Sequence, residues 1–281
     1  MTSTAVSSRF TCPKVMGILN VTPDSFSDGG KYSSVDKAVK AALRMVDQGA
    51  DIIDIGGEST RPGALQISVD EEISRTLPVV EGLASSMAHR RTEPIVQISI
   101  DTRKPEVAKA AIDEGAHIWN DVSALTFDAH SVDVAAGLNC PVILMHMQGT
   151  PGDMQDAPTY DDVVAEIKLW LTTRITAAVA GGVRRENIII DPGVGFGKTV
   201  EHNLALLKYL KDFTDIYCPI LIGASRKSFI KGLDSGAVKN RLGGSVAIAL
   251  WAADQGAAIL RVHDVVETVQ ALKVWDSIQG G

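Results

Sequence analysis

The sequence of 281 residues predicts a single (β/α)8 barrel. Three observations support this fold class. Eight short apolar runs alternate with helical patterns, and a short sequence motif recurs at the junction between a helical stretch and the apolar run that follows it. Most of the runs end on a polar side chain. Short apolar runs separated by helices indicate parallel strands that are buried on both faces. An open, doubly wound sheet is the alternative, because it is built from the same strand–helix units.

The predicted strands and helices alternate along the whole chain. The apolar runs are continuous, as is typical of strands covered on both faces. They begin near Val15, Ile52, Val96, His117, Val142, Ile188, Ile220 and Ile259. Stretches with helical spacing cover residues 35–48, 69–88, 106–114, 161–180, 201–210, 245–255 and 265–278.

A repeated phrase predicts where three helices end. Gly49-Ala50, Gly115-Ala116 and Gly256-Ala257 each follow a helical pattern and open an apolar run. Glycine readily takes the left-handed backbone conformation that ends many helices. We therefore expect these glycines to terminate their helices, and the recurrence indicates one repeated supersecondary unit.

Polar or ionisable side chains follow most of the predicted strands. In chain order they are Asn20, Asp54 with Glu58, Asp101, Asn120 with Asp121, His146, Asp191, Ser225 with Lys227, and Arg261 with His263. In a parallel barrel the carboxyl ends of all strands meet at one mouth, so these residues would converge there. Packing alone does not explain so many polar strand ends, although for His146 and Asp121 a structural hydrogen-bonding role is the favoured interpretation.

The segments rich in glycine, proline and serine are interpreted as mouth loops rather than linkers. They cover residues 22–34, 59–68 and 148–158, and each comes directly after a predicted strand. The domain is therefore expected to span residues 1–281, with residues 1–13 as a short N-terminal extension.

Composition excludes several classes of protein. The chain has 27 Lys and Arg against 34 Asp and Glu, a net charge of −7, with 45% hydrophobic and 5% aromatic residues. This excludes intrinsic disorder, collagen and small disulfide scaffolds, and it argues against nucleic-acid binding, which needs a basic field and stacking aromatic side chains. No apolar run reaches the roughly 18 residues that span a bilayer. Three cysteines without a C-x-x-C pair favour a reducing compartment, so we expect a cytoplasmic protein with no membrane partner.

The glycine-rich segment 191–199 is not a nucleotide-binding motif. A P-loop requires glycine where this chain has Pro192, and a dinucleotide fingerprint requires glycine or alanine where it has Lys198. What remains is a flexible loop after a strand-end aspartate, which can approach a flat ligand closely.

One group of strand-end residues favours a heterocyclic ligand. Asp101, Asn120 and Asp191 offer oxygen acceptors that match the N–H-rich edge of a heterocycle, and Lys227 offers a cationic donor. Solvated caps and metal ligands are the alternative interpretations of the two aspartates.

A second group favours an anionic ligand such as a diphosphate, with a magnesium ion. Arginine forks and a histidine bind such groups, and amide or hydroxyl side chains help to orient them. The residues are Asn20, Thr60, Arg61, Arg261 and His263. The alternative is a set of salt bridges at the rim, which is the favoured interpretation for Arg226 and Lys198. No triad, H-E-x-x-H or C-x-x-C motif indicates hydrolysis or zinc chemistry.

The helical stretch 245–253 is apolar almost all round, with Val246, Ile248, Leu250 and Trp251 on different faces. Outer helices of a barrel usually present a polar face to water. We therefore expect this helix to lie in a subunit interface, most simply that of a homodimer.

Five segments closely resemble the signature segments of the bacterial dihydropteroate synthase family. They are MGILNVTPDSFSDGG at 16–30, GGESTRPG at 56–63, DPGVGFGK at 191–198, GASRKS at 223–228 and RVHD at 261–264. The first two are long and specific, and the others follow in the expected order. The resemblance extends from Val15 to the final helix. The segment Val122-Ser-Ala-Leu-Thr126 differs from the commoner family wording.

The resemblance implies a pterin-binding barrel that condenses 6-hydroxymethyl-7,8-dihydropterin diphosphate with p-aminobenzoate, giving 7,8-dihydropteroate and diphosphate for folate biosynthesis. The implied catalytic residues are Asp101, Lys227, Arg261 and His263. The implied pterin ligands are Asp101, Asn120, Asp191 and Lys227, and the implied diphosphate ligands are Thr60, Arg61, Arg261 and His263. The implied p-aminobenzoate pocket consists of Phe26, Pro62, Phe196 and Ser225, and Mg²⁺ is placed at Asn20.

Two other functions fit the same kind of barrel. A pterin-binding methyltransferase is disfavoured by the TPDSFSDGG and SRK segments, and a catalytically silent paralogue is disfavoured by intact Asn20, Arg61, Lys227 and His263. Some sulfonamide-insensitive relatives carry an insertion after the proline that matches Pro62. This chain has none there, so we expect sulfonamide sensitivity.

Overall fold

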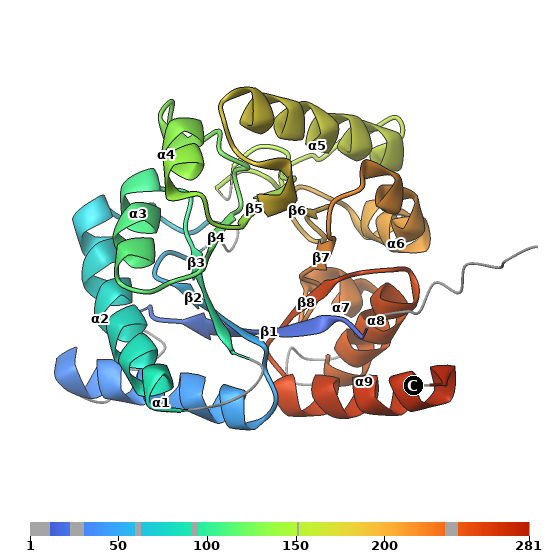
Figure 1. Cartoon of the computed structure of the whole chain (residues 1–281). Coiled ribbons are helices and arrows are strands. Elements are labelled where there is room, and N and C mark those ends of the chain that lie inside the picture. The colour runs from blue at the N-terminus through green and yellow to red at the C-terminus, as the bar shows by residue number, and fades with distance from the viewer. Residues whose placement is uncertain are drawn as a thin grey trace, which may run out of the picture.

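The computed structural model describes residues 12–22, 31–59, 63–90, 95–150, 152–233 and 241–280, and its strands form one parallel ring surrounded by helices (Figure 1). The strands are β1 (Lys14–Asn20), β2 (Ile52–Gly56), β3 (Gln97–Asp101), β4 (Ile118–Asp121), β5 (Val142–Met145), β6 (Ile188–Asp191), β7 (Leu221–Ile222) and β8 (Ile259–Val262). They pair in the order β6-β5-β4-β3-β2-β1-β8-β7. A parallel bridge between Ile190 and Ile220 joins β6 to β7 and brings the two ends of the sheet together. The predicted barrel is confirmed, and the open sheet is wrong.

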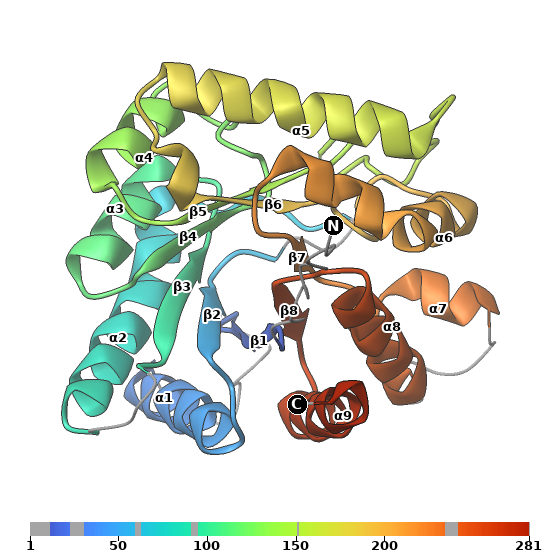
Figure 2. The ribbon, with the colours of Figure 1, turned by 45° about the vertical axis from the view of Figure 1, so that its right-hand side comes forward.

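The helices lie outside the ring and follow the strands in turn (Figure 2). They are α1 (Lys31–Asp47), α2 (Val69–Ala88), α3 (Pro105–Asp113), α4 (Ser131–Leu138), α5 (Val163–Ala180), α6 (Val200–Lys208), α7 (Ser228–Leu233), α8 (Leu242–Asp254) and α9 (Val265–Gln279), with 3-10 segments η2 (Arg185–Asn187) and η3 (Leu210–Ile216). The predicted helices are all present; α2 has the predicted ends, and the others have one or both ends shifted. In particular, the loop predicted for 22–34 ends early, because α1 already begins at Lys31.

Two helices were not expected from the sequence. Helix α4 follows His130, whose side chain makes no capping hydrogen bond, and α7 has only six residues. Neither segment therefore carries the start signal or the length by which a helix is recognised in a sequence. By contrast, Ser68 caps α2 by accepting the Glu71 N–H at 3.2 Å, and Asp162 caps α5.

The glycines of the repeated phrase end their helices as predicted. Gly49, Gly115 and Gly256 have φ values of 99°, 108° and 94°. Side chains with a Cβ rarely adopt this conformation, so glycine is the residue that ends α1, α3 and α8 at least cost.

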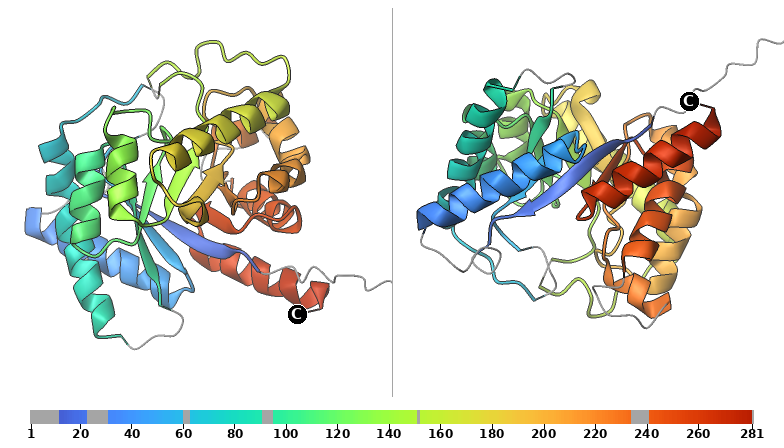
Figure 3. Two further views of the ribbon diagram at one scale, coloured as in Figure 1. Left: turned by 45° about the horizontal axis from the view of Figure 1, so that its top comes forward. Right: turned by 90° about the horizontal axis from the view of Figure 1, so that it is seen from below.

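Helices α1 and α9 flank β1 from the outside (Figure 3). A Cβ on Gly17 of β1 would lie 3.0 Å from Met45 Sδ of α1 and 3.2 Å from Val265 Cγ2 of α9. The absence of a side chain at Gly17 therefore lets both helices pack closely against the strand. No helix within the described ranges is both long enough and apolar enough to cross a membrane. All three cysteines are free.

The barrel interior is layered. One apolar layer takes a buried side chain from each of seven strands: Met16, Ile52, Ile118, Ile143, Ile189, Leu221 and Ile259. Since side chains alternate along a strand, residues two positions later face the same interior. In β2, β4, β6 and β8 those residues are Asp54, Asn120, Asp191 and Arg261. The apolar layer therefore forms the floor on which a polar layer lies at the carboxyl ends of the strands.

Candidate active site

Strand register brings the first polar residues into one row. Asn20 pairs with Gly56, Gly56 pairs with Asp101, and Asp101 pairs with Asn120 across β1 to β4. A Cβ on Gly56 would lie 3.7 Å from Asn20 Oδ1 and 3.5 Å from Asp101 Oδ2. Glycine at this position therefore leaves space between the Asn20 amide and the Asp101 carboxylate.

Arg261 of β8 forms a buried ion cluster with two carboxylates, Asp54 of β2 and Asp101 of β3. Its Nε donates to Asp54 Oδ2 at 2.6 Å, and its Nη2 donates to Asp101 Oδ2 at 2.6 Å. Asn120 Nδ2 also donates to Asp54 Oδ2, at 3.1 Å. Asp54 is fully buried, and within the part of the chain described here its Oδ1 has no hydrogen-bond partner. The carboxylate of Asp54 thus orients both Arg261 and Asn120.

Burial changes the charge balance of this cluster. Desolvation raises the pKa of Asp101 to about 7, because it outweighs the attraction of Arg261 and is reinforced by the negative charge of Asp54. The two carboxylates hold the pKa of Arg261 above its ordinary value although burial opposes this. Near neutral pH, Arg261 remains cationic while Asp101 lies close to its titration point.

The loop after β6 places an acceptor and an aromatic ring beside Lys227. Asp191 Oδ1 accepts the Gly193 N–H at 2.7 Å, and burial raises the pKa of Asp191 to about 6. Lys227 Nζ lies 3.7 Å from the centre of the Phe196 ring. Burial, reinforced by Arg261, lowers the pKa of Lys227 to about 8.

Glycine is required in this loop for a specific reason. Gly195 has φ +84°, and a Cβ there would lie 2.9 Å from Lys227 Cδ. At Gly195 the loop therefore packs closely against the aliphatic part of the Lys227 side chain. A Cβ on Gly223, the residue after β7, would lie 3.9 Å from Asp191 Oδ2 and 3.8 Å from Arg261 Cβ, so a side chain at this position would contact both groups.

Ser225 and His263 form a pair at the ends of β7 and β8. Ser225 Oγ accepts the His263 backbone N–H at 3.2 Å and lies 3.2 Å from His263 Nδ1. Burial, with the cations Arg261 and Arg226, lowers the pKa of His263 to about 4, so the ring is neutral at pH 7. The tautomer of the neutral ring decides whether Nδ1 accepts from the Ser225 hydroxyl or donates to its oxygen.

Of the remaining predicted site residues, one is described by the structure and four are not. Asn20 is half-buried at the end of β1. Phe26, Thr60, Arg61 and Pro62 lie outside the described residues. Over the residues that are described, no group of three or more His, Cys, Asp or Glu side chains could hold a metal ion.

Comparisons with known proteins agree with this geometry. The family described as "Pterin binding enzyme" matches residues 16–263. Dihydropteroate synthase of Escherichia coli strain K12 is 51% identical over 262 residues, which cover 93% of this chain and 90% of that protein. The chain belongs to the dihydropteroate synthase family of pterin-binding enzymes. It is accordingly a transferase of folate biosynthesis.

Solved structures of this family share the fold over nearly the whole chain. Xanthomonas albilineans dihydropteroate synthase with 4-aminobenzoic acid has a TM-score of 0.88 and 47% identity, covering 97% of this chain and 95% of that one. Yersinia pestis dihydropteroate synthase in a sulfonamide drug complex has a TM-score of 0.88 and 44% identity, covering 100% and 99%. The similarity therefore includes the strand ends at which the polar layer lies.

Several polar strand-end residues have structural roles in this member of the family. Asp121 accepts hydrogen bonds from Ser123 N–H, Ser123 Oγ and Leu125 N–H at 2.6–2.7 Å, and His146 Nδ1 lies 3.0 Å from Lys198 Nζ. The structural interpretation is correct for both. Arg226 pairs with Asp264 at the rim, as expected.

The rim interpretation is wrong for Lys198, which is only 3% exposed and donates to the Phe196 carbonyl at 2.8 Å. The reason is that the glycine loop folds back over β5: a Cβ on Gly193 would lie 1.8 Å from the His146 carbonyl oxygen. Lys198 is therefore enclosed between the ends of β5 and β6.

Sequence reasoning missed two interactions. Asp54 was recognised as a strand-end residue but given no role, although it orients Arg261; its inward-facing strand position was the available signal. Lys104, which was not singled out, is 1% exposed and bonds Glu58 Oε1 at 3.0 Å and Glu72 Oε2 at 2.5 Å. No local pattern marks a lysine whose partners come from a distant loop and from helix α2.

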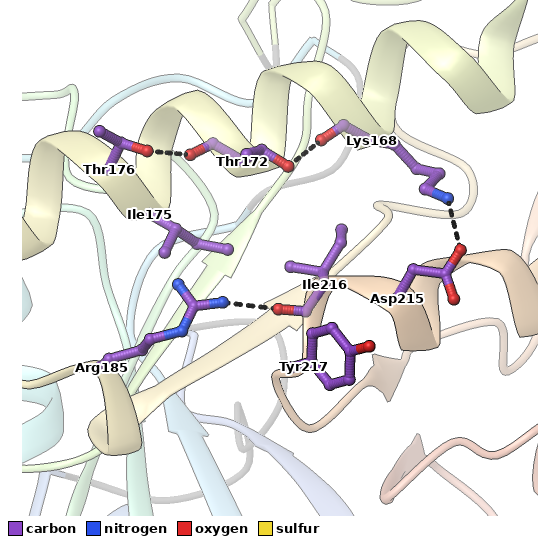
Figure 4. Close-up of a pocket in the computed structure, with 8 residues that line it drawn as sticks. All are labelled: Lys168, Thr172, Ile175, Thr176, Arg185, Asp215, Ile216 and Tyr217. Carbon is purple, nitrogen blue, oxygen red and sulfur yellow. Dashed lines mark hydrogen bonds and ion pairs between the residues drawn. The ribbon is translucent and has the colours of Figure 1, made fainter.

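A further groove lies apart from the mouth, between α5 and η3 (Figure 4), with a volume of about 230 Å³. Its cations already have protein partners: Lys168 Nζ lies 3.5 Å from Asp215 Oδ2, and Arg185 Nη2 donates to the Ile216 carbonyl at 2.7 Å. None of the strand-end residues lines it. The polar layer at the mouth is therefore the candidate active site.

Proposed function

We propose that the chain condenses 6-hydroxymethyl-7,8-dihydropterin diphosphate with p-aminobenzoate, giving 7,8-dihydropteroate and diphosphate. The observation that carries this proposal is the grouping, at one barrel mouth, of the acceptors Asp101, Asn120 and Asp191 with the cations Lys227 and Arg261. The 51% identity to a dihydropteroate synthase and the complex of a similar structure with 4-aminobenzoic acid support it.

The acceptors suit the pterin ring. Asn120 and the carboxylates of Asp101 and Asp191 present oxygens to its N–H groups, while Lys227 donates to a ring carbonyl or nitrogen. The same carboxylates resist full ionisation when buried, since desolvation raises the pKa values of Asp101 and Asp191 to about 7 and about 6. Binding of a donor-rich edge would favour their charged forms.

The donors beside this set suit the leaving group. Arg261 and His263 would hold the diphosphate, assisted by Thr60 and Arg61, and they would stabilise the charge that develops as the carbon–oxygen bond breaks. The amine nitrogen of p-aminobenzoate then forms the new bond to the methylene carbon and loses one proton. The chain supplies positioning and electrostatic stabilisation, and none of its side chains acts as a nucleophile in this proposal.

The residues fit a magnesium ion that is held together with the diphosphate. Asn20 offers one amide oxygen, which lies 3.7 Å from the Cβ position that glycine leaves unfilled at Gly56. Mg²⁺ keeps several waters and is commonly held by one or two protein oxygens plus substrate phosphates. When bound, the ion supplies positive charge to the diphosphate, and Asn20 would be its ligand from this chain.

The remaining side chains suit the second substrate. The Phe196 ring lies against the Lys227 ammonium, and Ser225 comes two residues before Lys227. With Phe26 and Pro62 they would frame the p-aminobenzoate pocket. A sulfonamide resembles p-aminobenzoate in shape and would compete for this pocket. The complex of the similar Yersinia pestis enzyme with a sulfonamide drug supports sensitivity of this chain.

We further propose a cytoplasmic homodimer built on α8. The exposed apolar side chains on α8 and α9 include Trp251, which is 46% exposed, and Val274, which is 57% exposed. Covering such side chains in a subunit interface would remove apolar surface from water. Light scattering of the purified chain tests this, and a monomeric mass contradicts it.

The activity is tested by incubating the purified chain with the pterin diphosphate, p-aminobenzoate and Mg²⁺, and by measuring both dihydropteroate and diphosphate. Formation of the two products in equal amounts supports the proposal. Pterin binding without turnover would indicate the silent paralogue, and methyl transfer to a corrinoid protein would indicate the methyltransferase.

A further inference from the structure

The turn that joins β7 to α7 holds a non-glycine residue in an unusual conformation. Arg226 has φ +58°, and the turn is closed by a hydrogen bond from the Lys227 N–H to the Ala224 carbonyl at 3.5 Å. At this position of a turn a positive φ favours glycine. A residue with a Cβ stays in this conformation only when neighbouring contacts determine it.

The residues on either side of Arg226 belong to the candidate site and point to different partners. Ser225 bonds His263, while the Lys227 ammonium lies over the Phe196 ring. Because the backbone at Arg226 sets the relative directions of its neighbours, any change of that backbone would misdirect at least one of them. The guanidinium of Arg226 itself pairs with Asp264.

Helix α8 supplies the contacts that hold this backbone. The Arg226 N–H donates to Ser245 Oγ at 2.9 Å, the Ser245 hydroxyl donates to the Arg241 carbonyl at 2.7 Å, and Arg241 Nη1 donates to the Arg226 carbonyl at 2.9 Å. Both backbone polar groups of Arg226 are therefore bonded to the first turn of α8. Ser245 is 7% exposed and Arg241 is 9% exposed, so water competes weakly for these bonds.

We infer that Ser245 is a positioning residue for the active site, which holds Arg226 in its left-handed conformation and thereby directs Ser225 and Lys227. The inference rests on the proposed function, because that function gives Ser225 and Lys227 their roles. It also assigns a different role to the start of α8, whose apolar residues alone predicted an interface helix. Ser245 touches no substrate and acts through the turn.

The first test compares Ser245→Ala with Ser245→Thr. The alanine variant leaves the Arg226 N–H without its acceptor, and we expect kcat/KM to fall about tenfold, the effect of one lost hydrogen bond to a buried group. The threonine variant keeps a hydroxyl at the same place and should recover most of the loss. Thermal unfolding of each variant is measured alongside, so that a folding defect is distinguished from a defect of positioning.

The second test uses the backbone strain itself. In Arg226→Gly the left-handed conformation costs little, so adding Ser245→Ala to that background should lower kcat/KM by less than about threefold. In Arg226→Ala, which also lacks the Asp264 ion pair but keeps a Cβ, Ser245→Ala should still cost about tenfold. Equal effects of Ser245→Ala in both backgrounds would overturn the inference.

A readout independent of turnover separates this inference from the proposed function. Acetylation of Lys227 with acetic anhydride, followed over pH by mass spectrometry, reports the environment of its amine. We expect Ser245→Ala to move the Lys227 profile toward that of an exposed lysine and Ser245→Thr to leave it unchanged. If the wild-type chain makes no dihydropteroate but the profile moves, the proposed function fails and the inference stands. An unmoved profile in Ser245→Ala with wild-type turnover refutes the inference.

Discussion

The most informative single substitution is Asp54→Asn, which removes the buried carboxylate that orients Arg261. Asp54 Oδ2 lies 2.6 Å from Arg261 Nε, and the side chains of Asp54 and Arg261 are 0% and 18% exposed. Breaking a buried ion pair commonly costs about 3–5 kcal/mol. Arg261 keeps Asp101 as a second partner, and the repulsion between the two carboxylates is relieved. We therefore expect the lower end of this range, about 3 kcal/mol.

The matched control is Asp47→Asn. Asp47 Oδ1 also lies 2.6 Å from an arginine, Arg90 Nη1, but these side chains are 62% and 35% exposed. An exposed ion pair contributes about 0–1 kcal/mol, because water and salt screen it and the two side chains lose conformational freedom. The two variants thus share the chemical change and the distance, and they differ in burial and in the additional partners, Asn120 and Asp101, of the Asp54–Arg261 pair.

The assay is thermal unfolding at pH 8. For a chain of this size, about 1 kcal/mol lowers Tm by roughly 2–4 °C, so Asp54→Asn should lower Tm by about 6–12 °C and Asp47→Asn by about 4 °C or less. Turnover of Asp54→Asn should fall as well, because the common acceptor of Arg261 and Asn120 loses its negative charge. Equal changes of Tm in the two variants would refute the argument that burial gives this pair its strength.

Other outcomes follow from single contacts at the mouth. Lys227→Ala should abolish most diphosphate release, whereas the control Lys231→Ala, on the exposed side of α7, should not. Near-wild-type release by Lys227→Ala would contradict the proposed role of Lys227 in pterin binding. Gly195→Ala should weaken pterin binding, measured by calorimetry, by about tenfold or more, because the new Cβ would collide with Lys227 and the backbone φ is +84°. The control Gly137→Ala, which has open space around its Cβ position, should leave pterin binding unchanged. His263 has a pKa lowered to about 4, so its neutral form contributes stability above pH 6.5 that is lost as pH falls toward 4. His263→Gln should flatten this part of the stability profile in urea titrations, and an unchanged slope would count against the neutral ring.

Strand-end position was the strongest guide to the site. Asp101, Asn120, Asp191 and Arg261 could be selected from the sequence because each terminates an apolar run, and parallel strands of a barrel end at one mouth. The glycines that end three helices were predictable for a similar reason, since their conformational requirement is local.

Hydrogen-bond partners were less predictable than positions. That Asp54 receives both Arg261 and Asn120 depends on strand register and on the stagger of the barrel, which no local pattern encodes. Lys198 was expected at the rim, where a lone lysine usually lies, but the folded glycine loop encloses it. Helices α4 and α7 could not be predicted, because α4 lacks a capping side chain and α7 has only six residues. Their formation depends on contacts with neighbouring elements.

The sequence by itself determined the repeated strand–helix units, the inward face of each strand and the polar residues that end it, because these depend on periodicity and on single-residue preferences. The tertiary structure alone decided which charges share a partner, which are buried and how the turn at Arg226 is held by α8. Those features depend on distances between separate segments, which are 207 residues apart for Asp54 and Arg261 and 19 residues apart for Arg226 and Ser245, and on the loss of water around them. Periodicity carries no information about either quantity.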